Sequence, residues 1–115
     1  MSHEFLRSRL HYYAATLLMY IAREEAAIAQ YKRAIAYDPR YINAWRNLAF
    51  ILAQGNDEAA AVDTYTKALA VAPDDHGTRF NLGFVLHKYR RFEAAIAEFE
   101  QVVKLSLPAR CSAGR

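Results

Sequence analysis

Four histidines and one cysteine are the side chains best suited to chemistry in this sequence, and their spacing decides what they could support. The histidines stand at positions 3, 11, 76 and 87, and no two of them are one helical turn apart. A zinc site needs three or four closely spaced ligands. Cys111 is the single cysteine and can form neither an internal disulfide nor a thiolate cluster. We therefore expect no metal and no cofactor, and a reducing compartment, the cytoplasm.

Catalysis by a nucleophile would require a serine or cysteine together with a histidine and an orienting acid. The sequence offers no such grouping, and it has no glycine-rich loop of the kind that holds phosphate. The paired carboxylates Glu24-Glu25 and Asp74-Asp75 fall at expected helix starts and turns, where acids favour the N-terminus of a helix. These patterns predict a protein that is not an enzyme.

Composition points to helices. Alanine occupies 22 of 115 positions, while there are only 4 glycines and 3 prolines. Alanine loses no side-chain entropy on helix formation. The apolar stretch 14–22 is far shorter than the ~20 residues of a membrane-spanning helix, so no membrane segment is expected; a signal peptide is the alternative for this stretch.

A 34-residue period organises the chain. Pro39 and Pro73 are 34 residues apart, and each follows a similar stretch of sequence. The same step relates small, aromatic and small residues in three successive windows: Ala27, Ala61 and Ala95; Tyr31, Tyr65 and Phe99; Ala34, Ala68 and Val102. Such a period indicates stacked supersecondary units.

These residues resemble the signature of the tetratricopeptide repeat (TPR) family, whose 34-residue unit is a pair of antiparallel helices. The middle repeat matches best, through Trp45, Leu48, Ala49, Leu52, Ala61, Tyr65, Ala68 and Pro73. Arg79 replaces the tryptophan in the third repeat, and His11 and Ala14 depart from the pattern in the first. The resemblance implies an all-α solenoid, a right-handed superhelix of helix pairs.

The domain organisation follows from the period. We expect a tail or helix extension over 1–7, a TPR domain over 8–109 and a tail over 110–115. The three repeats would occupy 8–41, 42–75 and 76–109. Periodicity and turn residues predict helices near 5–21, 24–37, 42–54, 58–71, 76–89 and 92–106.

The resemblance also implies a peptide-binding groove lined by the first helix of each repeat. The matching positions are Arg9, Tyr12, Tyr13 and Thr16 in the first repeat, Asn43, Arg46, Asn47, Phe50 and Gln54 in the second, and Phe80, Asn81, Phe84 and Lys88 in the third. Asn47 and Asn81 occupy equivalent places, where family members use asparagine to bind the backbone of an extended peptide. Of the carboxylate clamp found in chaperone-tail-binding members, only Asn47 is matched.

Charge is segregated between the two helices of each repeat. The segments 8–21, 42–55 and 76–89 contain no Asp or Glu, although the chain has 12 acidic residues and a net charge of +3. A non-acidic, aromatic groove suits a peptide with acidic or carboxylate groups and apolar side chains. Alternatively, the first helices exclude charge because they are more buried.

Ile96, Phe99 and Val103 are expected at an uncovered edge of the last repeat, where they could pair with another copy or a partner; a longer repeat array is the alternative. We do not expect nucleic acid as a partner, although the last third of the chain is basic through Arg79, Lys88, Arg90, Arg91 and Lys104. The sequence therefore predicts a non-catalytic protein-interaction module, a scaffold or adaptor that holds an extended peptide or partner helix. The alternative is a structural unit that self-assembles through its edges into a homo-oligomer.

Overall fold

Six helices make up almost all of the part of the chain that the structure describes. The structure is a computed structural model that describes residues 3–20 and 23–106. The helices are α1 (His3–Tyr20), α2 (Glu24–Tyr37), α3 (Ile42–Gln54), α4 (Glu58–Val71), α5 (His76–Lys88) and α6 (Phe92–Ser106). Four helices have the predicted bounds, and α5 ends one residue earlier than predicted. For the first helix the sequence predicts 5–21, whereas α1 begins two residues earlier and ends at Tyr20, with residue 21 outside the described residues. The predicted tail 110–115, the last residues of the third repeat and Cys111 lie outside the described residues.

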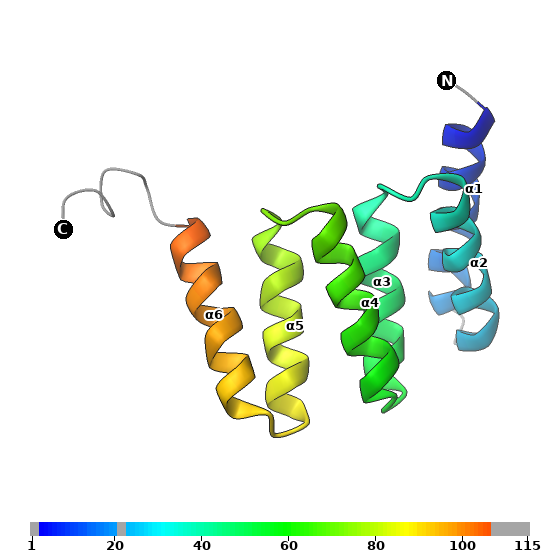
Figure 1. Cartoon of the computed structure of the whole chain (residues 1–115). Coiled ribbons are helices and arrows are strands. Elements are labelled where there is room, and N and C mark those ends of the chain that lie inside the picture. The colour runs from blue at the N-terminus through cyan, green and yellow to red at the C-terminus, as the bar shows by residue number, and fades with distance from the viewer. Residues whose placement is uncertain (1–2, 21–22, 107–115) are drawn as a thin grey trace.

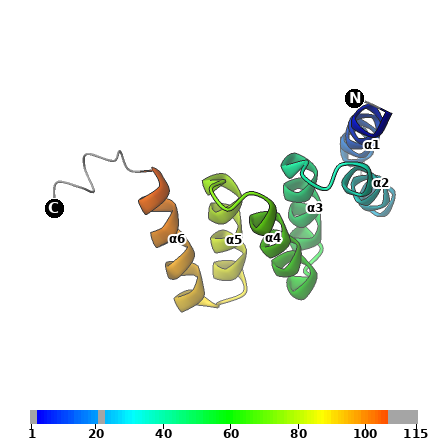
Figure 2. The same cartoon turned by 45° about the horizontal axis from the view of Figure 1, so that its top comes forward.

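The helices form three antiparallel pairs, α1 with α2, α3 with α4 and α5 with α6. The pairs stand side by side in chain order, so that α1 and α6 lie at opposite ends (Figures 1 and 2). The alternate helices α1, α3 and α5, which begin the pairs, are called the first helices below, and α2, α4 and α6 the second helices. No helix in the described ranges is long and apolar enough to cross a bilayer.

The turns inside the second and third pairs are built the same way. In the second pair, the N–H of Asp57 donates to the carbonyl of Leu52 and the N–H of Asn56 donates to that of Ala53. This pattern closes a helix with one residue in the left-handed region, and Asn56 has a φ of 64°. One repeat later, Arg90 takes the same conformation with a φ of 66°. The backbone therefore repeats even where the residue type changes.

The turn between pairs is fixed by a side chain of the following first helix. The indole Nε1 of Trp45 donates to the carbonyl of Pro39 over 2.8 Å. Arg79 stands 34 residues later, and its Nη2 donates to the carbonyl of Pro73 over 3.2 Å. Arg79 thus replaces the signature tryptophan in sequence and also in function.

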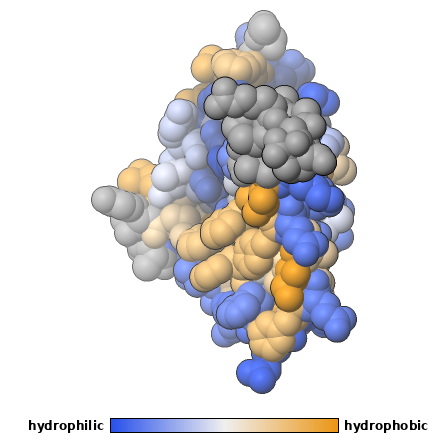
Figure 3. All heavy atoms as spheres, turned by 90° about the vertical axis from the view of Figure 1, so that its left-hand side faces the viewer, coloured by the Kyte–Doolittle hydropathy of each residue, from blue (hydrophilic) through white to orange (hydrophobic). Residues whose placement is uncertain are grey.

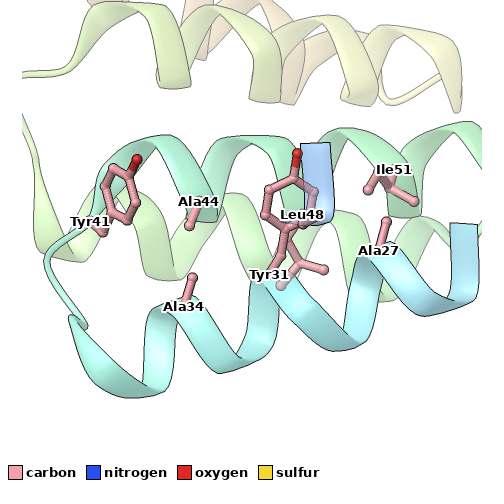
Figure 4. Close-up of a cluster of buried hydrophobic side chains, with 8 residues drawn as sticks. Ala27, Tyr31, Ala34, Tyr41, Ala44, Leu48 and Ile51 are labelled. Carbon is pink, nitrogen blue, oxygen red and sulfur yellow. The ribbon is translucent and has the colours of Figure 1, made fainter. Parts of the chain in front are cut away.

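Small residues let the helices approach closely. Ala27, Ala34 and Ala44 are completely buried where α2 faces α3, and the ring of Tyr31 fills the space beside them (Figure 4). A second cluster repeats this arrangement around Ala61 and Tyr65. The alanines are therefore contact points that set the spacing between helices.

Candidate peptide-binding groove

Two hollows follow one another along the first-helix face. The first hollow has a volume of about 310 Å³ and is lined by Thr16, Met19, Tyr31, Asn47, Phe50 and Ile51. The second has a volume of about 100 Å³ and is lined by Phe50, Ala53, Gln54, Tyr65, Asn81, Phe84, Val85 and Lys88. Phe50, half exposed, belongs to both and separates them.

The two hollows are equivalent by the 34-residue repeat. Every residue of the first hollow has its counterpart in the second: Thr16 and Phe50, Met19 and Ala53, Tyr31 and Tyr65, Asn47 and Asn81, Phe50 and Phe84, Ile51 and Val85. Each hollow is lined by a tyrosine from a second helix and an asparagine from a first helix. The groove therefore offers two successive sites of the same plan.

A closed hydrogen-bond network fills the polar side of the first hollow. The Nδ2 of Asn47 donates to the hydroxyl of Tyr12 (3.1 Å) and to that of Tyr31 (3.2 Å). The hydroxyl of Thr16 lies 3.1 Å from that of Tyr31 and donates to the backbone carbonyl of Tyr12. Asn47 consequently ties α1, α2 and α3 together.

Replacing Asn47 with alanine should therefore cost stability, whereas the equivalent change at Asn81 should not. Asn81 forms no hydrogen bond among the described residues. We expect Asn47→Ala to lower the free energy of unfolding by about 1–2 kcal/mol, because two hydrogen bonds are lost. Asn81→Ala should stay within about 0.5 kcal/mol. Urea titrations of both variants check this, and equal losses would contradict it.

The groove arginines are balanced by acids from the turns between repeats. Arg9 pairs with Asp38 over 2.9 Å, and its guanidinium lies 3.6 Å from the ring centre of Tyr41. Arg46 pairs with Asp75 over 3.3 Å and donates to the Oδ1 of Asn43 over 2.7 Å. The first helices carry no acid, but the turns supply one to each of these arginines.

The remaining groove residues lie around the second hollow and beside it. The Nζ of Lys88 donates over 2.8 Å to the carbonyl of Ala53 near the end of α3, which also accepts the N–H of Asn56. The rings of Phe80 and Phe84 stack with their centres 6.5 Å apart, and Phe84 is 63% exposed. Gln54 forms no hydrogen bond among the described residues.

Tyr13 lies apart from the two hollows. It is 64% exposed and occupies in α1 the place that Asn47 occupies in α3. There it faces outward, because no described helix precedes α1.

Phe99, predicted at an uncovered edge, packs inward. Its ring lies 5.5 Å from that of Phe80, and a Cβ built on Gly83 would be 2.8 Å from its Cε1. Ile96 and Val103 are both more than half exposed. An apolar strip bordered by hydrophilic side chains is visible at the α6 end of the molecule (Figure 3).

Burial raises the pKa of Tyr65 and Tyr41, each to about 12. For Tyr65 the loss of hydration is the main cause, and the charge of Arg46 opposes it. For Tyr41 burial again dominates, and Arg9 opposes it. Both phenols thus keep their protons throughout the physiological pH range.

Stability should therefore fall in alkaline solution. The folded pKa of both phenols lies above the ordinary value near 10, so the unfolded chain loses these protons first. Their contribution is complete below pH 10 and is lost as the pH rises towards 12. Urea titrations at pH 9, 10 and 11 should show this decline, and Tyr65→Phe should make it shallower. An unchanged slope in that variant would contradict the assignment.

A larger hollow, of about 560 Å³, lies between α4 and α6, away from the first-helix face. Its polar residues include Glu58, Asp63 and Arg91, of which Glu58 and Arg91 form an ion pair. The equivalents of Asp63 and Arg91 one repeat earlier are Ala29 and Asp57, so its chemistry is not repeated. This hollow does not continue the groove.

Other chemistries find little support in the part of the chain that the structure describes. No three His, Cys, Asp or Glu side chains gather there as a metal site would require. Of the basic residues in the last third, Arg79 pairs with Glu98 and Arg91 with Glu58, while Lys88 binds a carbonyl. They do not form one open basic surface.

Sequence reasoning missed the second-helix contribution to the groove. The sequence predicts a packing role for Tyr31 and Tyr65. Both are buried, yet they also line the two hollows. The signal was present, because a tyrosine recurring at a 34-residue step places a hydroxyl at the same site twice. Met19, Ala53 and Val85 gave no comparable signal.

Six helices in three equivalent pairs, with a first-helix face that repeats its hollows, define a helical-repeat solenoid. The sequence pattern described as "TPR repeat" matches residues 23–55, and that described as "Tetratricopeptide repeat" matches 42–75 and 76–107. The chain belongs to the tetratricopeptide repeat family. Proteins of this family are generally interaction modules rather than catalysts.

Solved structures with the same fold include the crystal structure of MamA, at 18% identity and a TM-score of 0.82 over 90% of this chain. The Arabidopsis OM64 TPR domain has 16% sequence identity and a TM-score of 0.82, and the match covers 90% of this chain and 86% of that domain. The second TPR of Spaghetti (RPAP3), bound to the HSP90 peptide SRMEEVD, has 19% sequence identity and a TM-score of 0.78. That match covers 87% of this chain and 93% of the other.

The chain spans only 60% and 54% of the two MamA chains. No curated protein matches the sequence. At these identities the likeness shows the fold alone.

Proposed function

We propose that this protein is a non-catalytic interaction module, a cytoplasmic scaffold or adaptor that holds an extended peptide or partner helix along its first helices. The observation that carries the proposal is the repetition of the two hollows on either side of Phe50. A peptide laid across successive repeats would place one side chain in each hollow. The RPAP3 domain, with a bound peptide on the same fold, supports this use.

Among the groove positions expected from the sequence, some contact the ligand in this proposal and others hold the groove in shape. Phe50 and Phe84 are exposed and apolar, so they contact side chains of the ligand. Asn81, Gln54 and Lys88 contact its polar groups. Arg9, Arg46 and Asn47 hold the groove in shape through the bonds described above, and an acidic group of the ligand would meet Arg46 only in competition with Asp75.

A selection experiment tests this function. A random twelve-residue peptide library is selected against the protein, and the affinity of enriched peptides is then measured for two variants. Replacing Phe50 and Phe84 with serine should weaken binding at least tenfold, because two anchoring rings are lost. Phe92→Ser, at another exposed phenylalanine outside both hollows, is the matched control and should bind normally. Equal weakening of both, or none, would overturn the groove assignment.

A second candidate function, self-assembly through the ends, is favoured by an apolar stripe on α1. Leu6, Leu10, Tyr13 and Leu17 are all more than half exposed and share one face of the helix. One repeat later, Leu10 and Leu17 correspond to Ala44 and Ile51, which are buried against α2. The stripe is therefore the face that another second helix would cover.

The outer face of α6 is the matching surface. Ile96 and Val103 are more than half exposed, whereas their equivalents Ile28, Ile35, Val62 and Leu69 pack against the core in the inner repeats. The two helices also differ in charge: α6 has three glutamates and one lysine, and α1 has two arginines and one glutamate. In this candidate function, α6 of one copy covers α1 of another.

Such a contact joins different surfaces, so it would build a ring or an open chain rather than a dimer with one shared surface. Sedimentation velocity should show the mean mass rising with concentration, and Leu10→Lys should abolish the rise. A strict monomer over the whole range would eliminate this candidate and leave the groove proposal untouched.

A further inference from the structure

The hollow between α4 and α6 has a volume of about 560 Å³, within the range of roughly 300–1,000 Å³ that is typical of ligand sites. Its floor is apolar, because Leu86 of α5 and Val62 of α4 belong to the second core cluster. None of its lining residues lines either hollow on the first-helix face. A molecule bound here would therefore leave the groove accessible.

Short side chains on α4 keep this hollow open. Ala59 and Thr66 line it from that helix, and both are exposed. One repeat earlier, the equivalent positions of α2 hold the longer side chains Glu25 and Lys32. The fold thus accepts long residues at these places, and the hollow results from the residues chosen in α4.

The polar groups on the α4 side of the hollow already have partners. The hydroxyl of Thr66 donates to the carbonyl of Val62 over 2.8 Å, and Glu58 forms an ion pair with Arg91. Burial of a polar group is costly only where its hydrogen bonds are lost. An apolar side chain laid on the floor would consequently leave these groups satisfied.

The border of the hollow is acidic. α4 carries two acids and one lysine, and α6 carries three glutamates and one lysine, in a chain whose net charge is +3. Asp63 lines the hollow and pairs over 3.2 Å with Lys67, and both side chains are more than half exposed. Exposed pairs of this kind contribute little to stability, so a cation from a partner can take the place of Lys67. Charge complementarity therefore favours a basic partner.

The two bordering helices also suit a particular shape. α4 and α6 run in the same direction, with α5 between them (Figure 1). A furrow of this kind accepts the apolar face of an amphipathic helix, whose polar face stays in water.

We propose that this hollow is a second docking site, which binds a basic amphipathic helix of a partner protein. An apolar side chain of that helix rests on Val62 and Leu86, and a neighbouring lysine or arginine pairs with Asp63. The inference goes beyond the groove function, because the two sites share no residue. With both sites occupied, the protein links two partners.

Two designed helical peptides test the inference by titration into ¹⁵N-labelled protein. Both have fourteen residues with leucines along one face; one carries lysines on the other face, and its twin carries glutamates there. The basic peptide should shift the backbone amides of Val62, Leu86 and Ala94. The acidic twin should bind at least about tenfold more weakly, because it meets residues of its own charge.

A pair of lysine variants locates the site. Thr66→Lys copies Lys32 of α2, fills the hollow and adds a charge of the basic peptide's own sign, so it should weaken binding at least about tenfold. Ala29→Lys is the matched control. It adds the same residue to α2, outside the hollow, and should leave the affinity within about twofold. Thr66 and Ala29 are both exposed, so neither change disturbs the core.

The docking site would be overturned by unmoved amides at Val62, Leu86 and Ala94, by equal affinity for the two peptides, or by equal affinity of the two variants. Shifts at Asn47 and Asn81 in their place would also overturn it and would assign the basic helix to the groove. The groove function is judged separately, by the variants of Phe50 and Phe84. Either proposal can therefore fail without the other.

Discussion

Tyr31→Ala is expected to lower the free energy of unfolding by about 3–5 kcal/mol, the range for removing a buried aromatic ring. The ring is 2% exposed and lies among the alanines where α2 crosses α3. Its hydroxyl also bonds to Asn47 and Thr16, so the truncation breaks the network that joins three helices. The loss would be a large part of the 5–15 kcal/mol that stabilises an ordinary domain.

Tyr13→Ala provides the matched control for this variant. Tyr13 is a tyrosine of the same repeat, but it is 64% exposed. Its truncation should change the free energy of unfolding by no more than about 0.5 kcal/mol. Urea unfolding followed by circular dichroism measures both. Similar losses for the two variants would show that Tyr31 does not form the joint between the first two repeats.

Gly83→Leu is expected to destabilise the protein by about 2–3 kcal/mol, as overpacking of a well-fitted contact does. A Cβ at this position would lie 2.8, 3.0 and 3.1 Å from three ring atoms of Phe99. Phe99 is itself packed against Phe80, so its ring can yield only by losing that contact. The absence of a side chain at Gly83 is what lets α5 and α6 approach this closely.

Gly55→Leu is the control for this second prediction. A Cβ at Gly55 would meet only backbone oxygens, at 3.6 and 3.7 Å, and the residue is exposed. We expect a change within about 0.5 kcal/mol. A thermal melt of both variants decides the matter: a Gly83→Leu protein as stable as the parent would mean that the ring of Phe99 is not fixed where the structure places it.

The repeat architecture could be predicted almost completely from sequence. A proline step of 34 residues and the recurrence of alanine and tyrosine placed four of the six helices with correct bounds. The reason is that these residues act locally or against the adjacent helix. Even the replacement of Trp45 by Arg79 leaves the turn unchanged, since both side chains donate to a proline carbonyl.

The state of the groove residues could not be predicted in the same way. The 34-residue step predicts where Arg46 stands, but its partner Asp75 lies 29 residues away in a turn that varies between repeats. Asn47 and Asn81 stand at equivalent places in the sequence. Only the structure shows that the amide of Asn47 is hydrogen-bonded to the hydroxyls of Tyr12 and Tyr31. The partner of a hydrogen-bonding side chain depends on residues at several positions that are not equivalent by the repeat. A repeat pattern therefore does not predict that partner.

The proposed function requires that the two hollows on the first helices form the binding face. Amide chemical-shift mapping tests this requirement, with a library-selected peptide titrated into the labelled protein. We expect the largest shifts at Asn47, Phe50, Asn81 and Phe84, and no shifts at Glu58 and Val62 in the hollow between α4 and α6. Shifts confined to that hollow, or to the outer faces of α1 and α6, would contradict it.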